Sequence, residues 1–217
     1  KVYDEFIKLL ELEDGLLLNA DQKKSLQNIL WITGKLNKNI LAKSALTLCK
    51  EIGLKKDHSE KIQFLIVEEQ GIGKEYPFSG EKLSPVLSIY KAEDFQDAKS
   101  ISNKILNYQG KGHSIGIYTQ DSSRSMELGL ELPVCRVIVN QAHTFATGGS
   151  FTNGLPFSLS MGCGTWGKNS IDDNLNYKHF INVTRISTEI SGRESTLKDF
   201  FEKYCHKHHP KNLDLLD

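Results

Sequence analysis

The sequence predicts an α/β fold with a largely parallel sheet. Apolar residues recur at helical spacing in the first third of the chain, whereas short continuous apolar runs appear from residue 62 onward. These runs alternate with amphipathic segments, and a strand, helix, strand order requires crossover connections. Crossovers of this kind are right-handed and leave the strands parallel. We therefore expect helices layered on a mostly parallel sheet.

Three helices are expected before the first strand. The first runs from Lys1 to about Leu12, where apolar residues follow helical spacing. Asn19 and Gln22 form a capping-box pattern that opens the second helix. The third is expected from about Asn39 to Ile52, where a glycine follows and stops it.

Strands and helices then alternate. The expected strands are Ile62–Val67, Val86–Tyr90, Ile115–Thr119 and Val134–Val139. Between them, Asp94 caps a helix that ends near Gly110, and a short helix lies around Ser123–Gly129.

The segments after the fourth strand divide into a loop, an edge strand and a last helix. Asn140–Asn153 is polar and aperiodic, so it is expected to be a loop at a strand end, where open α/β sheets bind ligands. His179–Ile186 alternates like an edge strand, and Thr196 with Asp199 caps the last helix. The expected division is residues 1–178, an edge strand at 179–187 that pairs between copies, and a helix with tail at 188–217.

Composition limits the function classes. The 217 residues carry 27 basic and 27 acidic side chains, which gives no electrostatic indication of nucleic acid or a membrane surface as partner. No apolar run reaches the roughly 18 residues of a membrane span. Four widely spaced cysteines suit a reducing cytoplasm. The chain lacks signal-peptide features and begins in mid-helix without Met, so we expect a cytoplasmic protein and a fragment of a longer one.

The stretch Leu155–Ser170, LPFSLSMGCGTWGKNS, is rich in glycine. Gly162, Gly164 and Gly167 flank Cys163 and a Trp, and such spacing permits a close approach of the backbone to a ligand. A tight buried turn between two core elements is the alternative reading.

Four segments in fixed order carry a family resemblance. They are EKLSP at Glu81–Pro85, GHSIGIYTQD at Gly112–Asp121, LPVCRVIVNQ at Leu132–Gln141 and the glycine-rich stretch. Over about residues 1–187 this series resembles the C-terminal, catalytic-domain half of the aldehyde dehydrogenase superfamily. LSMGCGTWGKNS is similar to the CoA-acylating branch, and the loop NQAHTFATGG is most similar to that of sulfoacetaldehyde dehydrogenases. The resemblance implies a three-layer αβα catalytic domain.

The resemblance also implies the chemistry. In that family a cysteine thiolate attacks the aldehyde, a hydride passes to NAD or NADP, and CoA releases the thioester. The nucleophile lies shortly upstream of the segment that matches KVYDEFIKLLEL, so it is expected outside these residues. The chain alone is therefore expected to be inactive. A small aldehyde and CoA as partners, and assembly into a homo-oligomer, are further implications.

Three residues are implied at the cofactor and catalytic positions. Glu81 matches the glutamate that binds the nicotinamide ribose, and Leu83 stands where an aromatic side chain packs on the nicotinamide. His113 follows glycine at a strand start, as in the acylating branch, and could deprotonate the CoA thiol. The alternatives are a solvated surface glutamate and a structural, hydrogen-bonded histidine.

A second group lies near the expected substrate tunnel. His143, Thr144 and Thr147 could donate to a sulfonate, although an exposed polar loop is equally possible. Cys163 could line the substrate site, or serve only as a small packing residue. Lys168 replaces a family glycine, so it either adopts a positive φ at some cost or marks a slightly different loop.

The C-terminal tail and the function class leave alternatives open. Cys205, His206, His208 and His209 resemble a metal site, but adjacent histidines point apart and a solvated tail is preferred, so no metal is expected. A hydrolytic aldehyde dehydrogenase half, or a non-catalytic partner subunit with this fold, are the alternative functions.

Overall fold

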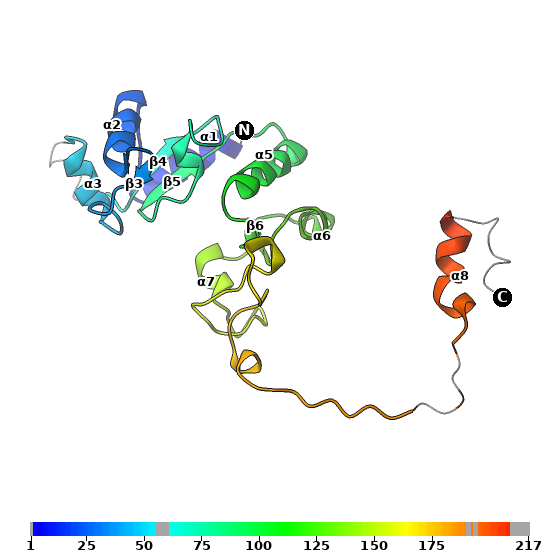
Figure 1. Ribbon diagram of the computed structural model, residues 1–217. Coiled ribbons are helices and arrows are strands. Elements are labelled where there is room, and N and C mark those ends of the chain that lie inside the picture. The colour runs from blue at the N-terminus through cyan, green and yellow to red at the C-terminus, as the bar shows by residue number, and fades with distance from the viewer. Residues whose placement is uncertain (1, 55–60, 190–191, 193–194, 209–217) are drawn as a thin grey trace. The chain divides into compact units, whose positions relative to one another are not determined.

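The structure is a computed structural model that describes residues 2–54, 61–189, 192 and 195–208. The chain divides into two compact units, residues 1–179 and residues 180–217 (Figure 1). All candidate site residues lie in the first unit, which contains two parallel sheets.

The first sheet is the middle layer of three, because helices cover both of its faces. Its strands are β1 (Gly15–Leu17), β4 (Phe64–Glu68) and β5 (Val86–Ile89), parallel and in the order β1-β4-β5. The helices are α1 (Val2–Leu12) on one face and α2 (Ala20–Leu30) with α3 (Ala45–Glu51) on the other.

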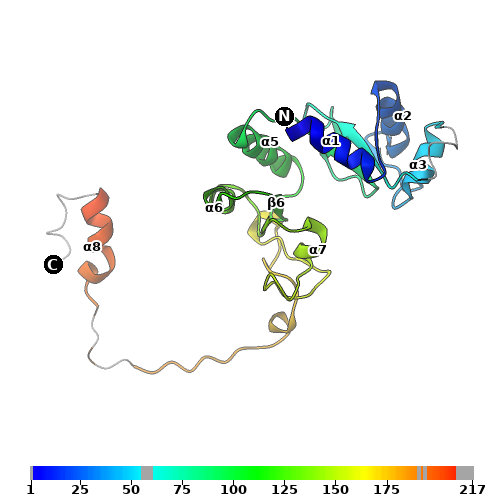
Figure 2. The ribbon, with the colours of Figure 1, turned by 180° about the vertical axis from the view of Figure 1, so that it is seen from behind.

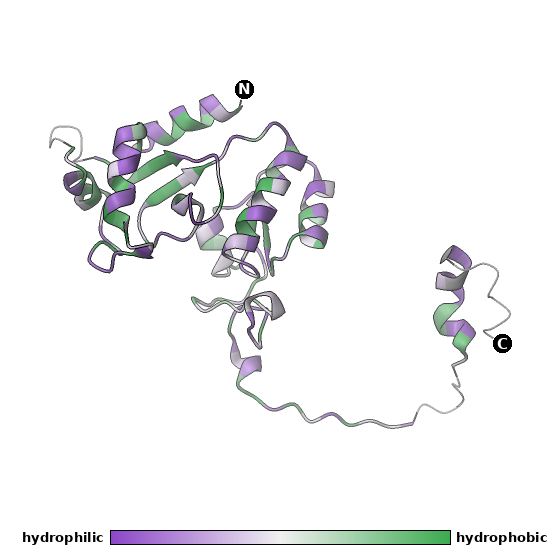
Figure 3. Ribbon diagram, turned by 45° about the horizontal axis from the view of Figure 1, so that its top comes forward, coloured by the Kyte–Doolittle hydropathy of each residue, from purple (hydrophilic) through white to green (hydrophobic). Residues whose placement is uncertain are grey.

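The middle strand explains why both faces are covered. Leu65 and Val67 of β4 join the core under α2 and α3, whereas Ile66 between them packs against Ile7 of α1. Successive strand residues point to opposite faces, so a continuous apolar run needs a helix on each side. Figure 2 shows α1 in front of the sheet, and Figure 3 shows the apolar strands among helices of mixed polarity. The predicted α/β layers are confirmed.

The second sheet belongs to the later part of the first unit. The elements are α5 (Phe95–Tyr108), β6 (Ile115–Ile117), α6 (Ser122–Glu131) and β7 (Val137–Val139), and β6 pairs with β7 in parallel. Leu106 of α5 and Leu128 of α6 share a core with Leu132 and Val134. Asp94 accepts from the Asp97 amide and caps α5, as predicted.

The third helix begins later than predicted. It starts at Ala45 and not at Asn39, because Ser44 takes the N-cap and its hydroxyl accepts from the Thr47 amide at 3.3 Å. Ala42 has a left-handed φ of 55°, and its amide donates to the Leu83 carbonyl at 2.9 Å. This long-range contact overrides the local helical pattern.

Other elements were not predicted at all. Besides β1, these are the hairpin β2 (Trp31–Ile32) with β3 (Lys35–Leu36) and, inside the predicted loop, the short helix α7 (His143–Thr147). Positive φ at Thr33 and Gly34 matches the tight turn that joins hairpin strands. Each of these elements is too short for a periodic signal.

The second unit begins after η3 (Tyr177–His179) and contains α8 (Leu197–His208). Asp199 accepts from the Thr196 amide at 2.8 Å, which confirms the predicted cap. Residues 180–189 are exposed and pair with no strand in the described part of the chain, so the edge strand between copies stays a prediction.

The structure covers only part of the C-terminal Cys and His residues, for which a solvated tail was preferred over a metal site. His209 and the side chains of Cys205 and His208 lie outside the described residues. Among the helices that are described, none is long and apolar enough to cross a membrane.

Candidate active site

A cavity of about 760 Å³ joins the first sheet to the segment that enters β6. It brings Glu81 and His113 into one site, although they lie far apart in sequence. Apolar side chains form part of the wall and include Leu36, Phe78 and Val86. A concave site with a few convergent polar groups is the usual form of a ligand pocket.

The Glu81 side of the cavity is held by backbone contacts. The Glu81 amide donates to the Gln109 side-chain oxygen at 2.8 Å, while its exposed carboxylate has no hydrogen bond within the described residues. The neighbouring Lys82 ammonium donates to the carbonyls of Phe78 and Gly80, both at 2.9 Å. Burial lowers the pKa of this amine against the raising effect of Glu69 and Glu81. A free carboxylate therefore lies beside a fixed amine.

Leu83 is placed differently from Glu81. It adopts a left-handed φ of 46°, and its carbonyl accepts from the Ala42 amide. Its side chain is half-exposed, and it does not line this cavity. A nicotinamide contact for Leu83 stays a prediction that this arrangement does not support.

His113 is linked to His143 through a hydroxyl. The Ser114 Oγ lies 2.7 Å from His113 Nδ1 and 2.8 Å from His143 Nε2. Burial, and then the nearby His113, lower the pKa of His143. A Cβ on Gly116 of β6 would stand 2.6 Å from His143 Nδ1, so this strand position must be glycine for the ring to lie there. The two predicted histidines thus belong to one hydrogen-bonded chain.

A buried arginine and a buried asparagine fix the backbone around the site. Arg136 donates through Nε to Asn174 Oδ1 at 2.9 Å and through Nη1 to the Gly162 carbonyl at 3.0 Å, with a longer contact to the His113 carbonyl. Asn174 Nδ2 donates to the carbonyls of Thr147 and Pro156, both at 2.8 Å. Arg136 Nη2 has no partner among the described atoms. These bonds join β7, α7, the glycine-rich stretch and the entry to β6.

The glycine-rich stretch is packed against backbone. A Cβ on Gly162 would stand 2.1 Å from the Ile171 carbonyl oxygen, and a Cβ on Gly112 would stand 2.0 Å from that of Cys163. The Cys163 amide donates to Asn169 Oδ1, and Lys168 has a left-handed φ of 58°. Glycine at these positions allows two backbone segments to lie in close contact, which agrees with the alternative interpretation of this stretch as a tight turn.

Replacing Gly162 with Ala is expected to destabilise the chain by about 1–3 kcal/mol, because neither backbone segment can yield without breaking hydrogen bonds. Gly129→Ala in α6 is the matched control, since its Cβ would meet only Val137 at 3.7 Å. That change is expected to stabilise by about 0.5–1 kcal/mol. Urea unfolding measures both, and shifts of the same sign would contradict the steric argument.

The two threonines of α7 differ in exposure. Thr147 is buried and its hydroxyl donates to the carbonyls of His143 and Thr144, each at 3.1 Å, so its proton is not free for a ligand. Thr144 is exposed on the surface of the helix. Of the predicted substrate donors, the structure connects only His143 to the cavity residues.

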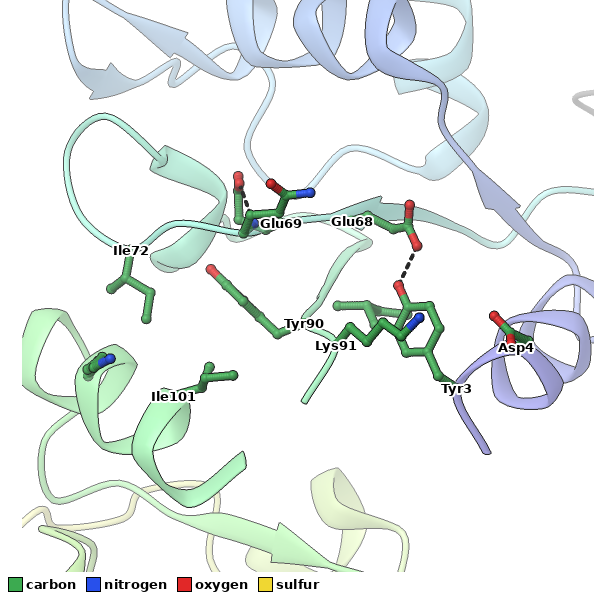
Figure 4. Close-up of a pocket in the computed structure, with 11 residues that line it drawn as sticks. Tyr3, Asp4, Glu68, Glu69, Ile72, Tyr90, Lys91 and Ile101 are labelled. Atoms are coloured by element: carbon green, nitrogen blue, oxygen red, sulfur yellow. Dashed lines mark hydrogen bonds between the residues drawn. The ribbon is translucent and has the colours of Figure 1, made fainter. Parts of the chain in front are cut away.

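A second cavity of about 610 Å³ lies at the carboxyl ends of β4 and β5 (Figure 4). Tyr3 donates to Glu68, and Tyr90 donates to the Gly71 carbonyl. Burial first, and then Glu68 for Tyr3 and Glu69 for Tyr90, raise the pKa of each phenol to about 12. Both phenol protons are engaged within the chain, so neither is poised to react. Nothing in the sequence patterns indicated this cavity.

The chain was compared with known proteins. No protein-family model matches it. It is 47% identical over 190 residues to the sulfoacetaldehyde dehydrogenase (acylating) of Cupriavidus necator, which covers 88% of this chain and 38% of that protein. It is 35% identical over 186 residues to the succinate-semialdehyde dehydrogenase (acetylating) of Clostridium kluyveri, covering 85% of this chain and 40% of that one.

A solved structure supports the same assignment. The acetylating aldehyde dehydrogenase from Geobacillus thermoglucosidasius matches with a TM-score of 0.80 and 29% identity, over 89% of this chain and 42% of that one. The resemblance to acylating aldehyde dehydrogenases, and to the sulfoacetaldehyde enzymes among them, is confirmed. The chain spans about two fifths of the length of the proteins it matches.

Proposed function

We propose that this chain, which shares the sequence and fold of acylating aldehyde dehydrogenases over most of its length, is part of an enzyme of that class. The enzyme would oxidise a small aldehyde to its CoA thioester with NAD or NADP. The observation that carries the proposal is the cavity in which the exposed Glu81 carboxylate and the His113 imidazole face the same space.

The cavity residues suit that reaction. A carboxylate without a partner can accept from two vicinal hydroxyls, so Glu81 would hold the ribose of the cofactor. The bound nicotinamide supplies the hydride acceptor. His113 would take the proton of the CoA thiol, since a neutral imidazole carries one nitrogen that can accept a proton.

The reacting thiol is proposed to lie outside these 217 residues. Burial raises the pKa of Cys49 and of Cys135, and a raised pKa disfavours the thiolate that attacks a carbonyl. Cys163 sits in the glycine-rich turn and is half-buried. Because the chain spans about two fifths of the length of this relative, the remaining part of a full-length enzyme would supply both the nucleophile and most of the cofactor site.

A short aldehyde with an anionic tail is the proposed substrate. The relatives at 47% and 35% identity are named for sulfoacetaldehyde and succinate semialdehyde, which carry a sulfonate and a carboxylate. An anion needs hydrogen-bond donors when it loses water. His143 and Thr144 of α7 are the proposed donors on this side, with sulfoacetaldehyde as the first candidate.

Activity of the isolated chain and of a chimera tests the proposal. The chimera joins this chain to the part of the Cupriavidus necator enzyme that it does not match. We expect no NAD(P)H formation by the isolated chain, and steady-state NAD(P)H formation by the chimera only when an aldehyde and CoA are both present. Comparing sulfoacetaldehyde with acetaldehyde ranks the substrates.

Each contrary outcome identifies another function. Turnover by the isolated chain would contradict an external nucleophile. Repeated turnover without CoA, beyond one NAD(P)H per active site, would support the hydrolytic alternative. A folded but inactive chimera would support a non-catalytic partner subunit.

A further inference from the structure

We propose that Ser114 and His143 are positioning residues that hold the His113 ring as its Nδ1–H tautomer, so that Nε2 accepts protons on the cavity side. This inference rests on the proposed function, which requires a base at His113. It goes further by giving Ser114 and His143 a role in orienting His113. From the sequence, we expected His143 only to bind substrate.

Ser114 has one hydroxyl proton, and a histidine ring lies on each side of its oxygen. Ser114 Oγ lies within hydrogen-bond distance of a nitrogen of each ring, 2.7 Å from His113 Nδ1 and 2.8 Å from His143 Nε2. A hydroxyl donates one hydrogen bond and accepts others. Ser114 Oγ has no other hydrogen-bond partner among the described residues, so its proton is used within this chain of contacts only if one neutral ring donates to Ser114 and the other accepts from it.

This restriction couples the two tautomers. If Ser114 donates to His143 Nε2, then His113 donates from Nδ1, and both rings carry their proton on Nδ1. If Ser114 donates to His113 Nδ1, both rings carry it on Nε2. Only the first arrangement leaves His113 Nε2 with a lone pair, and that nitrogen has no hydrogen bond to any described residue. A thiol in the cavity therefore meets a base in the first arrangement and a donor in the second.

His143 is built to remain neutral and to stay in place. Burial and the neighbouring His113 lower the pKa of His143, which disfavours the doubly protonated ring that could only donate to Ser114. The His143 ring lies over Gly116, where any Cβ would displace it. His143 is the first residue of α7, and Asn174 holds the other end of this helix by donating to the Thr147 carbonyl. The His143 ring is thus held in place, and the doubly protonated form, which could not accept from Ser114, is disfavoured.

Nitrogen-15 NMR of the full 217-residue chain, labelled in histidine and recorded above the titration of the rings, tests the inference. We expect His113 to carry its proton on Nδ1. Ser114→Ala removes the coupling hydroxyl, and His113 is then expected to shift to the Nε2–H form that a free imidazole side chain prefers. His179 is the internal control, because its Nδ1 contacts only the Asn176 backbone, so its tautomer should be the same with and without Ser114→Ala.

Two substitutions of His143 test the direction of the hydrogen bond between Ser114 and this position. His143→Glu offers Ser114 only acceptors and is expected to keep His113 in the Nδ1–H form, whereas His143→Lys offers only donors and is expected to invert it. If a charged replacement perturbs the fold, as judged from the backbone amide spectrum, Ser114→Ala still decides the question.

The outcomes separate this inference from the proposed function. An Nε2–H form of His113 in the unaltered chain, or an Nδ1–H form that survives Ser114→Ala, would overturn the positioning role. Neither observation depends on turnover. If the chimera is inactive and the tautomers are as expected, the positioning role stands and the proposed enzymatic function is wrong. If the chimera is active and His113 has the opposite tautomer, the enzymatic function stands and the positioning role is wrong.

Discussion

Replacing Asn174 with Ala is expected to lower the free energy of unfolding by more than about 3 kcal/mol. Asn174 is fully buried and makes three side-chain hydrogen bonds, with Arg136 Nε and with the carbonyls of Thr147 and Pro156. The change leaves Arg136 Nε and the Thr147 carbonyl buried without a partner, at a cost of about 1–3 kcal/mol each, and also removes the partner of the half-buried Pro156 carbonyl. Arg136 is affected most, because its charge stays buried while it loses its Nε partner and Nη2 already has none.

Urea unfolding of the chain measures this loss, and Asn107→Ala is the matched control. Asn107 is exposed on α5 and bonds only within its own helix. Its replacement by the better helix former should change stability by less than about 0.5 kcal/mol. Equal losses in the two variants would show that the buried network does not hold this region together.

Replacing His113 with Ala in the chimera is expected to reduce CoA-dependent turnover by about 10²-fold, the lower range for loss of a general base. The base acts on the thiol that releases the acyl group, so hydride transfer to the cofactor should fall much less. Rapid mixing separates the two steps, because a burst of NAD(P)H should precede a slowed steady state.

His206→Ala is the control for this change, since His206 lies exposed on α8 in the other unit. It should leave both phases unaltered. Equal reductions of burst and steady state in the His113 variant would argue that the ring supports the fold of the site and does not activate the thiol.

The main layers could be predicted from the sequence because their signals are local. The Asn19 and Gln22 capping box, the Asp94 cap and the apolar run of β4 each act within a few residues, and all are found where expected. The start of α3 could not be predicted. The segment before it has a helical pattern, but Ala42 is held in a left-handed conformation by a carbonyl of the distant Leu83.

The site shows the same limit. Glu81 and His113 were identified because each lies in a segment that resembles a known family, and the structure places them in one cavity. The bond between Arg136 and Asn174 joins residues 38 positions apart, and no periodicity links them. Arg136 does interrupt an apolar strand, and this local feature could have indicated a buried charge with a structural task, although we did not infer it from the sequence.

The partners of Arg136 and Asn174 also bear on how this scaffold could diverge. Apart from their bond to each other, these two side chains hold main-chain carbonyls, those of His113, Gly162, Thr147 and Pro156. Every amino acid carries such a carbonyl, so mutations in the loop can alter its side chains without removing its anchor points. Relatives could thus keep one loop shape while the side chains displayed on α7 change.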